Sequence, residues 1–197
     1  MKNKNLNFQN YLNENDLKNH KIKKVGKNVY LEKSCRVLGY KNIQIGSNVR
    51  IDSFCNLIVH NGFLKIEDNV HIGSFCHLVA TGGIKLMKYS GLSQGVKVYS
   101  ASDDFSGKYM TNPTVSKKFT NIKVKPVVLE KHVIIGSNSV ILPGSIIHEG
   151  AAVGALTLVN KSLDKWTIYQ GSPAKKIAAR SKDLIEKEKI FEKQNII

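Results

Sequence analysis

Aliphatic residues return every six positions through the C-terminal half of the chain, and a small residue usually follows each one four positions later. The aliphatic members are Leu129, Ile135, Ile141, Ile147, Val153 and Val159, and the residues four positions on are Val133, Ser139, Ser145, Ala151, Thr157 and Leu163. A six-residue unit is too short for a helix pair or a hairpin, but it fits one flat side of a three-sided solenoid. Three units make a coil of about 18 residues, and stacked coils bury the aliphatic side chains in one continuous column.

An earlier series keeps the same spacing less regularly. Its aliphatic members are Val25, Leu31, Val37, Ile45, Ile51, Ile66, Ile72, Leu78 and Ile84, and Lys88 takes the corner position of the last unit. Glycine often follows the aliphatic residue, as at Gly46 and Gly136, and we expect it to supply the unusual backbone angles of tight corners. Cys35, Cys55 and Cys76 fall at the small position, where we expect core packing rather than nucleophilic chemistry.

Breaks in the repeat divide the chain. Residues 59–65 lengthen one corner, and residues 101–126 form a long polar insertion without periodicity. Such an insertion is either functional or disordered, and the coils on both sides together with its aromatic residues favour an ordered, projecting loop. We predict an all-β chain with an N-terminal extension over 1–22, a parallel β-helix of hexapeptide repeats over 23–164 that carries the loop 101–126, and a C-terminal tail and α-helix over 165–197.

Both ends of the solenoid are expected to be covered by short helices. Residues 181–195 read as a helix with Ser181 as its N-cap, and this helix is predicted to close the C-terminal end. Its apolar face would consist of Leu184, Ile185, Ile190 and Phe191. The first twenty residues would form a short helix across the other end, with apolar positions at Phe8, Tyr11, Leu12 and Leu17.

Charge and hydropathy limit the classes of molecule that the protein is expected to bind. Thirty basic against fifteen acidic residues give a formal net charge of +15, which favours polyanions. The lysines are scattered, and no stacking-aromatic or base-reading motif accompanies them, so we expect no nucleic-acid binding. Two explanations stay open: compositional bias, or lysines that meet the phosphates of CoA and of a nucleotide sugar. No run of 18 apolar residues and no signal-peptide stretch is present, so we expect a cytoplasmic protein without a transmembrane segment.

Three stretches carry a family resemblance: HVIIGSNSVILPGSII from residue 132, GAAVGALTLVNKSL from residue 150, and GSPAKKI from residue 171. They resemble the bacterial hexapeptide-repeat acetyltransferases, in which the solenoid is a left-handed β-helix. The resemblance implies acetyl-CoA as co-substrate and a homotrimer with active sites in the grooves between neighbours. It also places Ser137 and the backbone of Ala155 beside the pantetheine arm of CoA. Lys161 and Lys175 would lie near the CoA phosphates, and Arg180 would extend that basic patch.

The sequence of the loop indicates which class of molecule accepts the acetyl group. The segment SASDDFSG with NPTV following, together with Trp166, resembles acetyltransferases of bacterial surface-polysaccharide (lipopolysaccharide) gene clusters. The resemblance implies N-acetylation of a nucleotide-linked amino sugar, such as a dTDP-3-amino-3,6-dideoxyhexose. Some members acetylate sugar hydroxyls instead, and O-acetylation stays open as an alternative.

The catalytic base is not settled by the sequence. Sugar O-acetyltransferases of this family carry a histidine in the matching loop, whereas this loop reads YSASDDFSG. A hydroxyl needs a base, but an unprotonated amine attacks a thioester without one. Asp103 and Asp104 are expected to hold the sugar, although two aspartates also suit a turn. His132 and His77 are the candidate bases, and both are expected to point outward from the coils.

Two other functions compete with acetyl transfer. A γ-class carbonic anhydrase shares such a solenoid, but it needs three histidines on one zinc ion. His71 and His77 are six apart and belong to different faces, and His132 and His148, 16 apart and close to the spacing of one coil, have no third histidine to join them. We therefore expect no metal. A non-catalytic binding or structural β-helix stays an alternative, although the CoA-end motif and the long loop argue against it.

Overall fold

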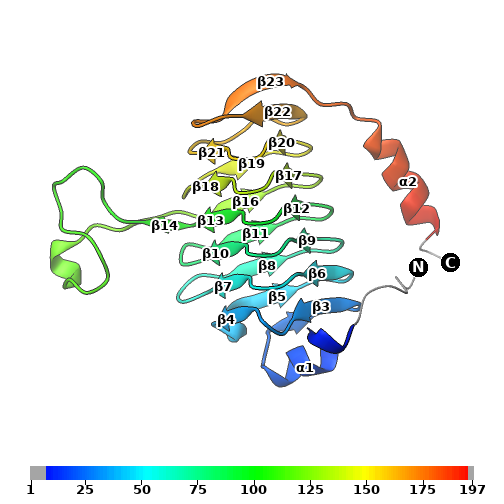
Figure 1. Ribbon diagram of the computed structural model, residues 1–197, viewed down its shortest axis with the longest axis horizontal. Helices are drawn as coiled ribbons and strands as arrows, with labels where there is room; N and C mark the ends of the chain where they lie inside the picture. The colour runs from blue at the N-terminus through cyan, green and yellow to red at the C-terminus, as the bar shows by residue number, and fades with distance from the viewer. Residues whose placement is uncertain (1–7, 195–197) are drawn as a thin grey trace.

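The computed structural model describes residues 8–194 and shows strands stacked as the coils of a three-sided parallel β-helix (Figure 1). The predicted all-β, left-handed β-helix with one C-terminal helix is confirmed. No helix of the described residues is long and apolar enough to cross a membrane.

Three sheets form the faces of the prism, and we name them the nine-stranded sheet, the β10 sheet and the β11 sheet. The nine-stranded sheet runs β1 (Tyr11–Leu12), β3 (Val29–Glu32), β6 (Val49–Ile51), β9 (His71–Ile72), β12 (Gly91–Leu92), β17 (Ile134–Ile135), β20 (Ala152–Val153), β22 (Thr167–Gln170) and β23 (Lys175–Ala179). The β10 sheet runs β4 (Arg36–Leu38), β7 (Asn56–Ile58), β10 (His77–Val79), β13 (Lys97–Tyr99), β18 (Val140–Ile141) and β21 (Leu158–Val159). The β11 sheet runs β2 (Lys24–Val25), β5 (Ile43–Ile45), β8 (Leu64–Ile66), β11 (Ile84–Leu86), β16 (Val127–Leu129) and β19 (Ile146–Ile147).

Coil length differs between the two halves. In the C-terminal half Ile141 pairs with Val159, 18 residues on, as the repeat predicts. In the N-terminal half Val29 pairs with Val49, 20 residues on. Several strands there, such as β5 and β6, are three residues long and turn two aliphatic residues inward. The prediction that Lys88 occupies a corner is therefore wrong: Lys88 is exposed, and Ser90 takes the buried corner instead.

The interior is a column of buried aliphatic side chains, because inward positions stack on one another from coil to coil. Val98, Ile141 and Val159 form one such stack, and all three are fully buried. Burying a side chain of this size contributes about 1.5–3 kcal/mol. The cysteines are free thiols at the predicted small positions. A hydrogen bond with Cys55, together with burial, raises the pKa of Cys35, so this thiol stays protonated near neutral pH.

The glycines that follow the aliphatic residues act through close packing rather than through backbone angle, which corrects the expectation. Gly46 and Gly136 are not among the residues with positive φ. A Cβ on either would lie 2.5 Å from an atom of the next coil. The left-handed conformation falls instead on other corner residues, such as Asn138, at φ 58°.

The two ends are covered differently from one another. At the N-terminal end, α1 (Glu14–Asn19) follows the 3-10 turn η1 (Phe8–Asn10) and buries Leu17 completely, so the predicted short helix is present. Residues 1–7 lie outside the described part. At the C-terminal end, β23 folds back antiparallel on β22.

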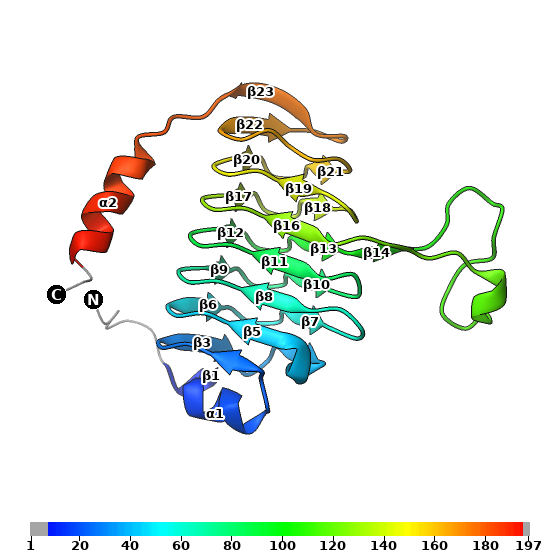
Figure 2. The same cartoon turned by 180° about the vertical axis from the view of Figure 1, so that it is seen from behind.

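The C-terminal helix α2 (Leu184–Gln194) does not close the end of the solenoid, so that prediction is wrong. It runs back beside the nine-stranded sheet, as Figures 1 and 2 show. Ser181 lies before the helix rather than at its cap, and its Oγ accepts a hydrogen bond from the Asp183 amide. Residue 195, the last of the predicted helix, lies outside the described residues.

Residues 101–126, which we call the arm, project sideways from the solenoid (Figure 2). The antiparallel strands β14 (Ala101–Ser102) and β15 (Lys123–Val124) form its stalk, and its tip carries the 3-10 turn η3 (Lys117–Phe119). Another 3-10 turn, η2 (Tyr40–Asn42), widens one corner of the N-terminal half.

Candidate functional site

The two aspartates at the base of the arm have different environments. Asp104 is buried, and its carboxylate accepts a hydrogen bond from the amide of Ser106. Hydrogen bonds from Ser106, with the nearby charge of Lys123, hold the pKa of Asp104 below its usual range. Asp103 is half-exposed, and within residues 8–194 its carboxylate has no hydrogen bond or ion pair. Asp104 therefore fixes the turn, and Asp103 is free to meet a ligand.

His77 lies on the outer surface of the β10 sheet, in the coil next to the one that leads into the arm. It pairs in register with Lys97, and its ring centroid lies 5.9 Å from that of Tyr99. Burial, with the neighbouring charge of Lys97, lowers the pKa of His77. The imidazole is therefore neutral near pH 7 and able to accept a proton.

Ser137 and Ala155 lie one coil apart at the corner between the nine-stranded sheet and the β10 sheet. The Ser137 hydroxyl donates to Oε1 of Gln94 in the preceding coil, at 3.4 Å, and its carbonyl accepts the Leu156 amide at 2.9 Å. Gln94, Ser137 and Ala155 thus mark an accessible edge parallel to the solenoid axis, which suits an extended ligand. Lys161 and Lys175 are exposed near the C-terminal end of the solenoid.

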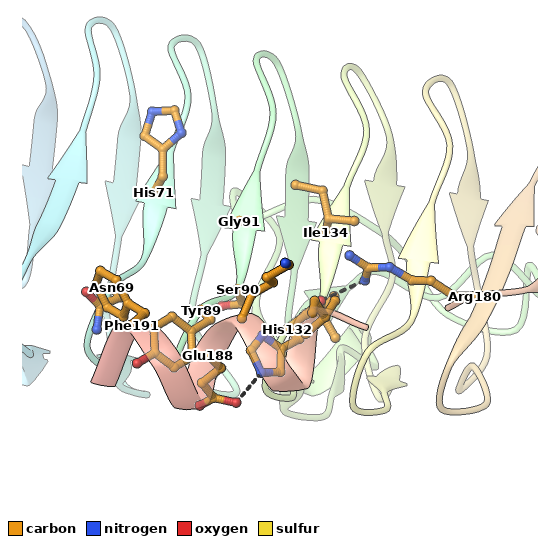
Figure 3. A pocket seen from close by; sticks show the side chains of 13 residues that line it. Asn69, His71, Tyr89, Ser90, Gly91, His132, Ile134, Arg180, Glu188 and Phe191 are labelled. Carbon is orange, nitrogen blue, oxygen red and sulfur yellow. Dashed lines mark hydrogen bonds and ion pairs between the residues drawn. The ribbon is translucent and has the colours of Figure 1, made fainter. Parts of the chain in front are cut away.

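His132 is not exposed, contrary to expectation, because α2 covers it. It begins the coil at a left-handed corner, at φ 61°, and is 8% exposed. Its Nε2 lies 2.8 Å from Oε2 of Glu188, and its ring stacks on Tyr89 with 5.2 Å between centroids (Figure 3). Lys131 pairs with the other oxygen of Glu188. These contacts fasten α2 to the solenoid at His132, next to the nine-stranded sheet, whereas His77 lies on the β10 sheet.

Arg180 precedes α2 and is half-buried. Its Nη1 donates to the carbonyl oxygens of His132 at 2.8 Å and Gly150 at 3.0 Å. These hydrogen bonds hold the C-terminal tail against the two corners of the solenoid at His132 and Gly150, so Arg180 has a structural role. Its predicted contact with CoA phosphates stays a prediction.

A groove of about 580 Å³ lies between α2 and the nine-stranded sheet (Figure 3). It is lined by Asn69, His71, Tyr89, Ser90, Gly91, His132, Val133, Ile134, Arg180, Leu184, Lys187, Glu188 and Phe191. The groove was not predictable from the repeat, because the repeat places these residues outward but does not say where the helix lies. One sequence feature could have indicated the groove: Gly91 has no side chain at a position where the neighbouring coils carry His71 and Ile134.

No group of three or more His, Cys, Asp or Glu side chains within residues 8–194 is placed to hold a metal ion. His71 instead contacts Asp52, with 2.7 Å between Nε2 and Oδ2, and His148 contacts Glu130, with 3.2 Å between Nδ1 and Oε1.

Comparison with known proteins places the solenoid, its arm and its tail in one family. The chain is 41% identical over 181 residues to the dTDP-4-amino-4,6-dideoxy-D-glucose acyltransferase of Escherichia coli, covering 92% of this chain and 94% of that protein. The chain belongs to the hexapeptide-repeat acyltransferases. It is therefore an acyltransferase, and acyl-CoA is the acyl donor of this class. No family model matches the sequence.

Solved structures of similar chains support the same family. AntD, an N-acyltransferase from Bacillus cereus in complex with dTDP and 3-hydroxybutyryl-CoA, is 39% identical with a TM-score of 0.91, covering 95% of this chain and 99% of AntD. A serine-to-alanine variant of AntD holds dTDP-4-amino-4,6-dideoxyglucose and coenzyme A, with a TM-score of 0.89 over 93% of this chain and 98% of that one, at 39% identity. The Vibrio cholerae hexapeptide-repeat acetyltransferase VCA0836, at 22% identity and a TM-score of 0.53 over 82% of this chain, shares the fold alone. The sugars named for the E. coli protein and for AntD carry a 4-amino group, whereas the example expected from the sequence was a 3-amino sugar.

Proposed function

We propose that this acyltransferase moves an acetyl group from acetyl-CoA to the amine of a dTDP-linked 4-amino-4,6-dideoxyhexose, for surface-polysaccharide synthesis in the cytoplasm. The two relatives that cover almost the whole chain support the sugar class. The observation that carries the proposal is the carboxylate of Asp103 at the base of the arm, which has no partner among the described residues 8–194 and lies beside the buried Asp104.

The chemistry needs an unprotonated amine close to the thioester carbon. Asp103 accepts a hydrogen bond from the amine and turns its lone pair toward that carbon. The N–C bond forms, the C–S bond breaks, and the proton lost by nitrogen is taken up by the departing CoA thiolate. His77, neutral near pH 7, is the histidine available on the open face to relay that proton. His132 is assigned a structural role, because α2 and Glu188 enclose it.

The pantetheine arm of acetyl-CoA is assigned to the edge marked by Ser137 and Ala155. A chain extended along this edge passes successive coils about 4.8 Å apart, the ordinary spacing of parallel strands. Lys161 and Lys175 lie toward the C-terminal end, where they meet the phosphates as point charges. Arg180 stays with its carbonyl partners.

The assembly is proposed to be a homotrimer in which the arm rests on a neighbouring copy. Large apolar side chains of the arm are exposed within one copy, and burying them is favourable. They are Phe105, Tyr109, Met110, Phe119 and Ile122. A neighbour that covered these residues would also close the outer face that carries His77.

The test compares Asp103→Asn with Asp183→Asn, a matched change at an exposed aspartate ahead of α2. Acetyl-CoA and dTDP-4-amino-4,6-dideoxyglucose are supplied, and thiol release is followed. A hydrogen bond to a charged group contributes about 1.5–3 kcal/mol, and about 1.36 kcal/mol changes a rate tenfold. The first variant is therefore expected to lower kcat/KM about 10- to 100-fold, and the second to leave it unchanged. Equal activity of both variants, with unaltered melting temperatures, would remove Asp103 from the reaction. A hydroxyl analogue of the sugar is the acceptor control, and preferred acetylation of the hydroxyl would overturn N-acylation.

A further inference from the structure

The positive charge of the protein is concentrated at the N-terminal end of the solenoid and is less evenly spread than the sequence suggests. Residues 8–42, which form α1 and the first coil, contain eight basic and three acidic residues. Residues 43–82, which form the next two coils, contain two basic and three acidic residues. Both basic residues there, Arg50 and Lys65, are paired with acidic side chains. Compositional bias would raise lysine in both segments alike, so it does not explain the difference.

Five of these cations surround the first coil, at the end of the solenoid that α1 covers (Figure 1). Lys24 lies on β2 of the β11 sheet, and Arg36 lies on β4 of the β10 sheet. Lys27, Lys33 and Lys41 lie at the corners of the same coil, between β2 and β3, between β3 and β4, and after β4. All five residues are exposed. We call them the basic collar, and because they belong to one coil they lie around one plane across the solenoid axis.

The acidic residues of this end do not neutralise the basic collar, because backbone amides already engage their carboxylates. Glu14 accepts a hydrogen bond from the amide of Asn28, and Asp16 and Glu32 accept theirs from amides two or three residues away. Within residues 8–194 no collar residue forms an ion pair. The collar therefore presents its charge to whatever approaches this end of the solenoid.

The arrangement of the collar fits a flat anionic surface. A small anion needs donors that converge on one point, whereas these residues lie on different sides of the coil. A nucleic-acid strand or an acidic peptide laid along the solenoid would reach one or two sides. A flat surface across the end reaches every side, together with the exposed Lys18 and Lys21 at the end of α1.

Contact with such a surface would be electrostatic. Within residues 9–42 no large apolar side chain is exposed, and α1 turns Leu17 into the core. Adjacent coils are about 4.8 Å apart, and the Debye length is about 8 Å at physiological ionic strength. The charges of α1 and the first coil therefore act on a surface at this end, whereas solvent ions screen those of the opposite end.

We propose that the basic collar binds the anionic surface of a lipid bilayer and holds the protein at the membrane by its N-terminal end. Lys161 and Lys175, to which the CoA phosphates are assigned, lie near the C-terminal end, and the arm projects from the middle coils (Figure 2). Membrane contact therefore leaves the proposed substrate sites open. The proposal concerns where the protein resides, and it holds whichever acceptor the enzyme uses.

Sedimentation with vesicles tests the proposal on the full chain. The vesicles contain phosphatidylcholine and phosphatidylglycerol in equal parts, or phosphatidylcholine alone. We expect binding to the anionic vesicles at low salt, no binding to the neutral ones, and release at about 1 M salt, where the Debye length falls to about 3 Å. Equal binding to both kinds of vesicle, or no binding to the anionic ones, would overturn the proposal.

A triple variant that combines Lys27→Gln, Arg36→Gln and Lys41→Gln removes charge from three different sides of the collar. A lysine or arginine near an anionic bilayer strengthens binding about fivefold, so the three changes together are expected to weaken it about tenfold or more after screening. All three residues are exposed, so the variant is expected to fold, and its melting temperature checks this. Unchanged vesicle binding would contradict the role of the collar.

The matched control combines Lys165→Gln, Lys176→Gln and Lys182→Gln, at three exposed residues near the C-terminal end. It removes the same charge and is expected to bind anionic vesicles like the wild-type protein. An equal loss in this control would show that total charge, rather than the collar, determines binding.

Two further measurements separate the membrane from other anionic partners. CoA affinity, measured by calorimetry, is expected to be the same in the collar variant and the wild-type protein, and a loss confined to the collar variant would make the collar a substrate site instead. A short RNA duplex is expected to bind more weakly than the anionic vesicles at equal phosphate concentration. Tighter binding of the duplex that is lost in the collar variant would assign the surface to nucleic acid and overturn the proposal.

Discussion

Replacing Glu188 by Gln tests whether one side chain fastens α2 to the solenoid. The Glu188 carboxylate is 9% exposed and contacts both Lys131 and His132. Glutamine has the same shape without the charge. The variant therefore removes the charge from two contacts and leaves the aliphatic packing of α2 in place.

The size of the effect follows from those two contacts. A hydrogen bond to a charged group contributes about 1.5–3 kcal/mol and a neutral one about 0.5–1.5 kcal/mol. Glutamine retains one neutral bond to each partner, and Lys131 is partly exposed to screening solvent. We expect docking of α2 to weaken by about 1–3 kcal/mol, which corresponds to a five- to 150-fold change in its opening equilibrium.

Hydrogen exchange of the α2 amides measures this opening directly. Exchange over residues 184–194 is expected to accelerate by the same factor, about five- to 150-fold, while the amides of the stacked coils stay protected. Glu186→Gln is the matched control, because Glu186 is exposed and pairs with Lys189, one turn along the same helix. If both variants exchange like the wild-type protein, the Glu188 contacts do not hold the helix.

Acid should release α2 in the same way. Burial alone would raise the pKa of Glu188, but its bonds to Lys131 and His132 hold the pKa below the usual range. A carboxyl with a depressed folded-state pKa stabilises the folded form above its unfolded pKa, and this contribution disappears as pH falls through the folded value. The single tryptophan, Trp166, lies 6.3 Å from the His132 ring. Its fluorescence should stay constant from neutral to mildly acidic pH and change only below the usual carboxyl range.

Three further predictions concern the core, the open face and the arm. Ile141→Ala, at a fully buried position, should lower the unfolding free energy in urea by about 2–5 kcal/mol, and Ile146→Ala, at a position 37% exposed, by clearly less; equal losses would contradict the inward register. NMR titration should show the pKa of His77 below its ordinary value, and Lys97→Met should raise it, because one cause of the shift is the Lys97 charge. Asp104→Asn should make the arm more sensitive to limited proteolysis, and unchanged cleavage would remove Asp104 as its anchor.

The solenoid was predictable because each of its contacts repeats. An inward aliphatic residue meets its equivalent in the next coil, so a period of six specifies both strand and neighbour. Leu129 to Leu163 follow that register throughout. Departures occur where the coils lengthen to 20 residues, and there the simple period misplaced Lys88.

The position of α2 was not predictable, because single tertiary contacts determine it. Nothing periodic links Glu188 to His132, 56 residues away in the chain. The helix therefore lies beside the sheet rather than over the end, and a histidine expected at the surface becomes enclosed. The environments of Asp103 and Asp104 were not predictable either. The two residues are adjacent in the sequence, and only the folded backbone shows that Asp104 is buried while Asp103 is half-exposed.

The most direct test of the central claim is product analysis by mass spectrometry. The purified protein is incubated with acetyl-CoA and dTDP-4-amino-4,6-dideoxyglucose, and the sugar nucleotide is then examined. The account predicts a product heavier by one acetyl group, attached at the 4-amino nitrogen, with one free CoA thiol released for each product formed. Unmodified sugar after prolonged incubation, or acetyl on a hydroxyl oxygen, would contradict it.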